Sequence, residues 1–284
     1  MPDPGTTLEA GGVTWRTTSA GVEILRRLGD VRFETAETLE GFELLKRKPD
    51  RFWGRLRLPA GTVFMKARKI GQLRRRLRTL FRPSAMREEW CKSWWLRSKG
   101  IATPEPLCVG EVRHHGMVCE NFFISRWIED ARPLRTFLEE SAVKLPPEQF
   151  QSLRSLVVKS LGHLLGTLHA AGAYHWEFHD MNILVVGSPE SPQFQPIDLD
   201  HLVIPNVFNE SDRDWNFHQL RWYLRKPIER WGLSPRDVVR FLRAYHSADP
   251  RCARDWRALH RRLDNHLAAE PLLERPHRRQ FRPA

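Results

Sequence analysis

The chain lacks any hydrophobic run that approaches the roughly 18 to 20 residues needed to cross a bilayer as a helix. Its first residues, Met1-Pro2-Asp3-Pro4-Gly5, have neither the basic start nor the apolar segment of a secretion signal. From these two absences we expect a protein of the cytoplasm, whose contact with a membrane, if it has one, is peripheral.

Cysteine is scarce, and the few thiols are scattered without a C-x-x-C pair, at Cys91, Cys108, Cys119 and Cys252. This spacing indicates neither a zinc site nor a disulfide framework, so we expect buried, reduced thiols. A metal ion, if bound, should be Mg²⁺ on oxygen ligands.

Acidic residues are too few to balance the basic ones, with 34 Asp and Glu against 46 Lys and Arg and a formal net charge of +12. This excess implies an anionic partner, which could be a nucleic acid, an anionic membrane surface or a phosphorylated substrate. The stretch 66–82 has eight basic residues and no acidic one, and Arg275, Arg278, Arg279 and Arg282 form a basic tail. Within that stretch, a solvated face and an anion-docking surface are equally good interpretations, the latter through Arg74, Arg75, Arg76 and Arg78.

Hydrophobic residues make up 41% of the chain, including 11 Trp and 15 Phe, which is enough for a sizeable core. The 284 residues could form one large domain or two lobes. Because the aromatic residues fall on predicted core faces and not between basic residues, we expect no nucleic acid partner.

One stretch in the second half of the chain has the order of a kinase catalytic loop. In the pattern H-R-D-x-x-x-x-N, the carboxylate accepts the proton of the acceptor hydroxyl and the Asn binds Mg²⁺. His175, Glu177 and Asn182 keep this order and spacing, with Glu in place of the usual Asp. Asp198 stands where a second Asp chelates the metals on the ATP phosphates. We therefore predict two catalytic residues, His175 and Glu177, and two metal ligands, Asn182 and Asp198.

A short H-x-E motif arises easily by chance, so its surroundings decide how it is interpreted. An amphipathic helix is predicted just before it, and the apolar run 183–186 follows it. Turn residues at 187–192 and a second short run then lead to Asp198. A loop between a helix and a tight hairpin is the usual setting of this chemistry, and the pattern favours a kinase fold.

Upstream, residues 42–69 have the pattern of successive strands, and Lys66 ends the apolar run 62–66. The Lys of V-A-I-K ends such a strand and contacts the α- and β-phosphates of ATP, although an ordinary strand-end lysine is the alternative. A kinase fixes this lysine with an acid from the next helix, here predicted at 84–98. We choose Glu89 for that ion pair over Glu88, which could equally be a solvated helix residue.

A hairpin predicted over 107–125 leads to a hinge at 126–128, where Trp127 could contact the adenine or pack in the core. These elements predict an α+β, bilobal protein-kinase-like fold, with an antiparallel-sheet N-lobe and a mainly helical C-lobe. We expect an N-terminal extension at 1–40, an N-lobe at 41–127, a C-lobe at 128–270 and a basic tail at 271–284. Lys66, Glu177, Asn182 and Asp198 should then converge around one triphosphate-binding cleft.

Three segments resemble the lipopolysaccharide core kinase family, which includes the heptose kinases and the Kdo kinases. They are Leu-Leu-Gly-Thr-Leu-His-Ala-Ala-Gly-Ala-Tyr-His at 164–175, Asn-Ile-Leu-Val at 182–185 and Ile-Asp-Leu-Asp at 197–200. The similarity extends over about residues 45–263. It implies transfer of the γ-phosphoryl group of ATP to a sugar hydroxyl of the lipid A core, with Mg²⁺, at the inner face of the cytoplasmic membrane. The implied partner is an anionic glycolipid or sugar-phosphate substrate.

The chain departs from the kinase pattern at several positions. Glu177 is one methylene longer than Asp, and a displacement of about an ångström can cost on the order of a hundredfold in rate. Trp176 replaces the Arg of regulated kinases, and His179 resembles the D-x-H-x-x-N pattern of aminoglycoside-type kinases. The segment 46–50 lacks the glycines of a phosphate-covering loop. A small-molecule kinase of the aminoglycoside or choline type and a catalytically impaired pseudokinase are therefore the alternatives.

Overall fold

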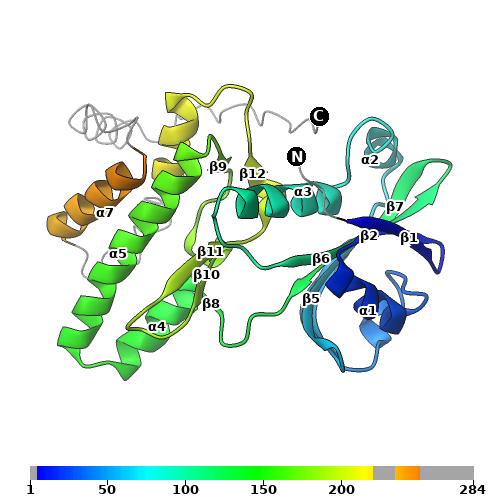
Figure 1. Ribbon diagram of the computed structural model, residues 1–284, viewed down its shortest axis with the longest axis horizontal. Coiled ribbons are helices and arrows are strands. Elements are labelled where there is room, and N and C mark those ends of the chain that lie inside the picture. The colour runs from blue at the N-terminus through cyan, green and yellow to red at the C-terminus, as the bar shows by residue number, and fades with distance from the viewer. Residues whose placement is uncertain (1–4, 220–233, 250–284) are drawn as a thin grey trace. The chain divides into compact units, whose positions relative to one another are not determined.

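The computed structural model describes residues 5–219 and 234–249 (Figure 1). Contacts divide them into two compact units. Unit 1 holds residues 5–98 and 103–129, and unit 2 holds residues 99–102 and the described residues from 130 onward. The change from unit 1 to unit 2 at 129/130 lies close to the lobe boundary expected at 127/128. The expected basic tail, with the last part of the expected C-lobe, lies outside the described residues.

Unit 1 is built on a seven-stranded sheet in which all neighbouring strands are antiparallel. In sheet order the strands are β1 (Thr6–Ala10), β2 (Val13–Thr17), β6 (Pro106–His114), β7 (Met117–Arg126), β5 (Gly61–Lys69), β4 (Arg51–Leu58) and β3 (Phe42–Lys48). The first 40 residues, expected as an extension, supply two of these strands, because β2 pairs with β6 at Thr14↔Glu111. They also supply helix α1 (Ser19–Leu28) and the 3₁₀ turn η1 (Ala36–Thr38).

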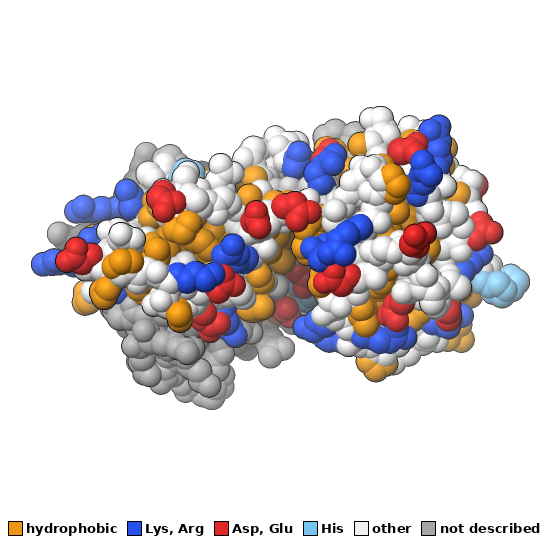
Figure 2. All heavy atoms as spheres, turned by 90° about the horizontal axis from the view of Figure 1, so that it is seen from below, with side chains coloured by type: hydrophobic (Ala, Val, Ile, Leu, Met, Phe, Trp, Pro, Cys, Tyr) orange, Lys and Arg blue, Asp and Glu red, His pale blue; other side chains and the backbone are white. Residues whose placement is uncertain are grey.

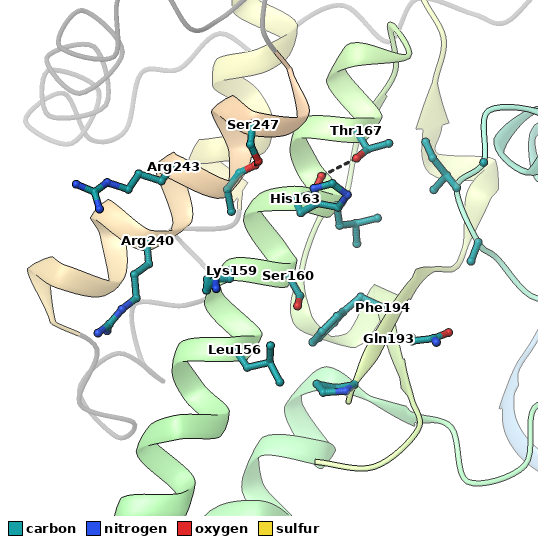
Figure 3. Close-up of a pocket in the computed structure, with 16 residues that line it drawn as sticks. Leu156, Lys159, Ser160, His163, Thr167, Gln193, Phe194, Arg240, Arg243 and Ser247 are labelled. Atoms are coloured by element: carbon teal, nitrogen blue, oxygen red, sulfur yellow. Dashed lines mark hydrogen bonds between the residues drawn. The ribbon is translucent and has the colours of Figure 1, made fainter. Parts of the chain in front are cut away.

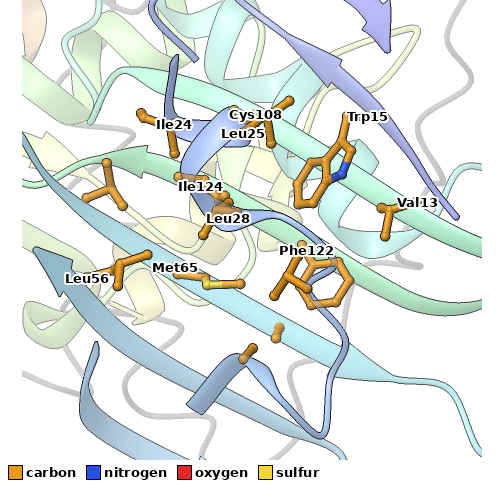
Figure 4. Packing of buried hydrophobic residues seen from close by; sticks show 14 of the residues in the cluster. Val13, Trp15, Ile24, Leu25, Leu28, Leu56, Met65, Cys108, Phe122 and Ile124 are labelled. Carbon is orange, nitrogen blue, oxygen red and sulfur yellow. The ribbon is translucent and has the colours of Figure 1, made fainter. Parts of the chain in front are cut away.

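Side chains on alternate positions of these strands point to opposite faces of the sheet, so each face has its own core. On one face, Phe122 and Ile124 of β7 pack with Trp15 and with Leu25 of α1 (Figure 4). On the other face, Phe123 packs with Val109 and with Trp90 of α3 (Ala85–Ser98). Helices α1 and α3 therefore cover opposite faces of the sheet.

Unit 2 is mainly helical, as Figure 1 shows. Among its described residues, the helices are α4 (Leu134–Lys144), α5 (Pro147–Ala170), a helical segment at 210–219 and α7 (Pro235–Ala248). Hairpin β10 (Ile183–Val186) and β11 (Gln193–Pro196) pairs with β8 (Arg132–Pro133), and β9 (Tyr174–His175) pairs with β12 (Leu202–Val203). The turns η2 (Asp180–Asn182) and η3 (Leu199–His201) complete it. Together with unit 1 this confirms the predicted α+β class.

The cysteines follow the expectation only in part. Cys91, Cys108 and Cys119 are free thiols, but of the three only Cys108 is buried and the other two are half-buried. Burial raises the pKa of the Cys108 thiol to about 12, which keeps it protonated and unreactive. No helix among the described residues is both long and apolar enough to cross a membrane.

Helix α5 packs closely against α7 because two glycines face it. A Cβ atom at Gly162 would lie 2.3 Å from the carbonyl oxygen of Phe241, and one at Gly166 would lie 2.5 Å from that of Tyr245. The N-terminus of α7 is fixed by a capping box, in which Ser234 and Asp237 bond each other's backbone amides. The segment Ser-Pro-Arg-Asp has the sequence of such a cap, with Pro235 at the first helical position. Since α5 leads directly into β9, this packing also supports the loop that follows.

The replacement Gly166→Ala should lower the free energy of unfolding by about 1 to 3 kcal/mol, because the added methyl group overpacks the α5–α7 contact. That cost exceeds the roughly 1 kcal/mol by which Ala favours a helix over Gly. Urea unfolding monitored by circular dichroism measures the change. Gly71→Ala is the matched control, because a Cβ atom there has no neighbour within 4 Å. An unfolding midpoint equal to wild type in Gly166→Ala would contradict the close approach.

Candidate active site

The predicted catalytic loop lies between β9 and β10 in unit 2. Helix α5 ends at Ala170, and Gly172, with φ 82°, turns the chain from the helix into β9. A left-handed residue after a helix end is usually glycine, because it has no Cβ atom to clash. The loop then passes through η2 and enters β10 at Ile183. The order of helix, loop and hairpin is the one predicted from the sequence.

The ring of His175 is buried and both of its nitrogens contact backbone groups. Its Nδ1 accepts a hydrogen bond from the Glu177 amide at 3.2 Å, and its Nε2 lies 3.0 Å from the Ile197 carbonyl oxygen. Because the carbonyl can only accept, Nε2 carries the proton and the ring is neutral. His175 therefore links the loop that carries Glu177 to the residue just before Asp198.

A buried amide holds the backbone of His175 in place. The Asn216 side chain accepts a hydrogen bond from the His175 amide at 3.1 Å and donates one to its carbonyl. His169 of α5 contacts the same Asn216 oxygen at 3.2 Å and the Tyr245 hydroxyl of α7 at 2.8 Å. This network joins α5, α7 and the helical segment 210–219 beneath the loop.

Burial sets the protonation of the two histidines. It lowers the pKa of His175 to about 4, an effect to which the neighbouring His201 adds. It also lowers the pKa of His169 to about 3. Removal from water disfavours the charged imidazolium, so both rings are neutral near pH 7.

Asn182 directly precedes β10 and Asp198 follows β11, so the two residues lie at the same end of this hairpin. The Asn182 amide donates to the Glu177 carbonyl at 3.0 Å, which leaves its Oδ1 as the atom that could bind a cation. Asp198 has φ 60° and ψ 49°, a left-handed conformation that is uncommon for a residue other than glycine. Strain of this kind persists where the surrounding structure imposes it, and it is frequent at functional sites.

Sequence reasoning missed His201, which lies among three carboxylates. Its Nδ1 is 3.8 Å from Glu177, and its Nε2 is 3.8 Å from Asp198 and 3.7 Å from Asp200. Ligand atoms of Glu177, Asp198 and His201 all lie within 4.8 Å of one another. The signal available in the sequence was a histidine three residues after Asp198.

The loop between β9 and β10 contains two acids, Glu177 and Asp180, and they have different surroundings. Asp180 is buried, and Arg135 of α4 binds both of its carboxylate oxygens at 2.8 and 2.9 Å. The Glu177 side chain is 44% exposed. Of these two acids, Glu177 is therefore the more accessible, and its role as the catalytic carboxylate stays a prediction.

Unit 1 holds the remaining predicted residues. Lys66 of β5 and Glu89 of α3 form a buried ion pair, with Nζ and Oε1 separated by 2.7 Å. Glu88 instead pairs with Lys92 at 3.1 Å. At the end of β7, Trp127 lies under the guanidinium of Arg55, which is 5.2 Å from its ring centre. The convergence of Lys66 with Glu177, Asn182 and Asp198 involves both units and stays a prediction.

A separate groove of about 870 Å³ lies in unit 2. Figure 3 shows Lys159, Ser160 and His163 of α5 between the α7 residues Arg240, Arg243 and Ser247 and the β11 residues Gln193 and Phe194. None of its lining residues is acidic, and none of the residues predicted to be catalytic lines it.

The comparison with protein-family models gives one match, to the lipopolysaccharide kinase (Kdo/WaaP) family over residues 61–245. The chain belongs to this family. The match covers β5, α3 and the whole stretch from the hinge to α7, so it includes every residue assigned above to the candidate site. Membership makes the protein a kinase of lipopolysaccharide biosynthesis.

Among solved structures, the chain is similar to WaaP in complex with acyl carrier protein. The TM-score is 0.60 with 21% identity, over 83% of this chain and 91% of that chain. This likeness shows the protein-kinase-like fold. The BubR1 kinase domain is a weaker match, with a TM-score of 0.40 and 12% identity over 73% of this chain and 52% of that chain. No curated protein matches the chain.

Acidification should destabilise the protein through the two buried histidines. Each folded pKa lies below the unfolded value of about 6.5, so the unfolded state binds more protons between the two values. The stabilisation is complete above pH 6.5 and is lost as the pH falls toward 4 and 3, by roughly 3 to 5 kcal/mol for each histidine at 1.36 kcal/mol per pKa unit. Urea midpoints from pH 7 to pH 4 measure this loss.

The variant His175→Asn removes one of these titrations and should flatten the dependence of the midpoint on pH. Equal slopes in wild type and variant would show that folding does not lower the pKa of His175.

Proposed function

We propose that the protein transfers the γ-phosphoryl group of ATP to a sugar hydroxyl of the lipopolysaccharide core, in the lipid A–Kdo or heptose region. The observation that carries this proposal is the link made by His175, which holds the loop of Glu177 and Asn182 beside Asp198. Membership of the Kdo/WaaP family supports the substrate class. An anionic glycolipid also agrees with the net charge of +12.

Each site residue has a role that its surroundings allow. Glu177 is partly exposed and would accept the proton of the sugar hydroxyl. Lys66 would bind the ATP phosphates, and Glu89 would hold the Lys66 ammonium in position. Trp127 would lie beside the adenine at the hinge.

The donor set fits a hard divalent cation. The amide oxygen of Asn182 and the carboxylate of Asp198 are oxygen ligands of the type that Mg²⁺ prefers. When bound, the cation would neutralise charge on the transferring phosphoryl group. His175 acts on this site through the backbone, since both ring nitrogens are used by Glu177 and Ile197, and it is therefore a positioning residue.

A glycolipid acceptor implies that the protein works at a membrane. We propose a peripheral contact with the inner face of the cytoplasmic membrane through Arg74, Arg75, Arg76 and Arg78 of α2 (Leu73–Arg78). Each basic residue near an anionic surface contributes about 1 kcal/mol to binding. Arg74, Arg75 and Arg78 are exposed and make no ion pair with a described residue.

Transfer of radiolabelled phosphate from ATP to purified lipid A core should require Asp198 and Lys66. We expect Asp198→Ala and Lys66→Ala each to lower the rate by about a hundredfold or more, because phosphoryl transfer depends on electrostatic stabilisation and positioning. Glu190→Gln, which removes an exposed carboxylate in the β10–β11 turn, should keep the wild-type rate. Equal labelling by all four proteins would dismiss the assigned roles, and labelling of aminoglycosides or choline in place of the core would indicate a small-molecule kinase.

The length of the catalytic carboxylate is tested at position 177. Glu177→Gln cannot accept a proton and should lower kcat about 10²- to 10⁴-fold, with little change in the affinity for ATP. Glu177→Asp restores the usual kinase residue and should keep measurable activity. ATP binding without turnover in both the wild type and Glu177→Asp would instead identify a pseudokinase.

A further inference from the structure

The segment 73–81 of unit 1 exposes an apolar face that the fold does not use. Helix α2 contains no buried residue, and backbone bonds from Thr79, Leu80 and Phe81 to residues three positions earlier continue its winding to Phe81. The exposed fractions along this segment are 63% for Leu73, 47% for Leu77, 46% for Leu80 and 87% for Phe81. Isolated exposed leucines are ordinary, but four large apolar side chains within nine residues form a patch.

The four side chains share one side of the helix. Their positions follow the spacing i, i+4, i+7 and i+8, which at 3.6 residues per turn falls within an arc of about 100°. The arginines occupy the rest of the circumference, with Arg74 and Arg76 next to the apolar arc on either side. A short amphipathic helix with arginine on its polar face and Leu and Phe on the other is the pattern of helices that lie in the membrane interface.

Polar contacts hold α2 on unit 1 with this face outward. Thr79 is buried, its hydroxyl accepts a hydrogen bond from the Val118 amide of β7 at 2.8 Å, and it donates to the Arg76 carbonyl at 2.6 Å. The Arg76 guanidinium donates to the Ile70 carbonyl at 2.5 Å. Leu80 lies beside the β6–β7 turn, because a Cβ atom at Gly116 would be 3.3 Å from it. These contacts that anchor the helix are therefore polar, except for that of Leu80, which is still 46% exposed.

The positive charge around the patch indicates an anionic partner. From 66 to 82 the chain has eight basic residues and no acidic one. By contrast, Figure 2 shows acidic and basic side chains mixed over the face of unit 1 that it displays. Arg74, Arg75, Arg78 and Arg82 make no ion pair with a described residue, so their charges can meet an external anion. Apolar side chains bordered by arginines of this kind complement a lipid leaflet, which has anionic headgroups at its surface and an apolar interior.

We propose that the segment 73–81 inserts Leu73, Leu77, Leu80 and Phe81 into an anionic lipid leaflet, with the arginines of α2 at the phosphate level. The purpose of this insertion rests on the proposed function, because insertion would bring the enzyme to an acceptor embedded in the membrane. It goes beyond an electrostatic contact, because burial of the apolar side chains makes part of the binding resistant to salt.

Co-sedimentation of the full chain with vesicles tests the insertion. Wild type should bind vesicles of phosphatidylglycerol and phosphatidylethanolamine and bind phosphatidylcholine vesicles at least tenfold more weakly. The double variant Leu77→Gln/Phe81→Gln keeps the net charge and should bind the anionic vesicles about tenfold or more weakly than wild type at high salt. Val143→Gln, at a valine that is also 87% exposed but lies on α4, should bind as wild type does.

Binding of the double variant equal to wild type at high salt would overturn insertion, as would equal binding of wild type to both kinds of vesicle or to neither. Unfolding midpoints of the variants should match wild type, because the replaced side chains are exposed. Phosphoryl transfer to acceptor dispersed in detergent separates this inference from the proposed function. The double variant should keep the wild-type rate there, whereas an inactive wild type would count against the proposed function alone.

Discussion

Two hydrogen bonds of the His175 ring hold together two segments that lie about twenty residues apart in the chain. One bond orients the amide of Glu177, and the other fixes the carbonyl of Ile197 directly before Asp198. If the ring turned or took up a second proton, one of the two backbone groups would lose its partner. Asn216 fixes the backbone from which this ring projects, because it bonds both the amide and the carbonyl of His175. The positions of the candidate base and of the candidate metal ligand therefore depend on one neutral, buried imidazole.

This arrangement explains why the helices of unit 2 matter to the site although none of them supplies its reactive groups. Asn216 contacts His169, and His169 contacts Tyr245, so α5 and α7 determine where the amide that clamps the loop can lie. The close approach of α5 and α7 at Gly162 and Gly166 brings these side chains within hydrogen-bonding distance. The loop is fixed by a buried polar network, in which a group without a hydrogen-bond partner costs folding free energy. The stability of unit 2 and the position of the loop therefore depend on the same contacts.

Local pattern was sufficient to predict the helix, loop and hairpin that carry the candidate catalytic loop. It was insufficient for the two sheet strands within the first 40 residues and for the residues that support the loop. Lys66 and Glu89 were predicted because Lys66 ends an apolar strand and a kinase fixes that lysine with an acid from the next helix, and the two side chains do form a buried ion pair. Asn216 has no such signal, since its role depends on contact with a loop about forty residues earlier. The exposed face of α2 could not be read from sequence either, because leucines at helical spacing usually predict a core and only the structure shows that they remain outside.

The glutamate at 177 is best understood from the rigidity of its backbone and the freedom of its side chain. The amide of Glu177 is bonded by His175 and its carbonyl by Asn182, so the backbone cannot retreat to compensate for the extra methylene. The side chain itself is 44% exposed, and the separation of 3.8 Å from His201 is too long for a direct hydrogen bond. Its carboxylate can therefore adopt several rotamers. Under the proposed mechanism, a cation or an acceptor hydroxyl fixes one of them, and the lost side-chain entropy adds to the activation free energy of phosphoryl transfer. Under the proposed mechanism, glutamate in place of aspartate lowers the population of reactive arrangements without altering the residues assigned to phosphate binding, so it should affect kcat more than the affinity for ATP.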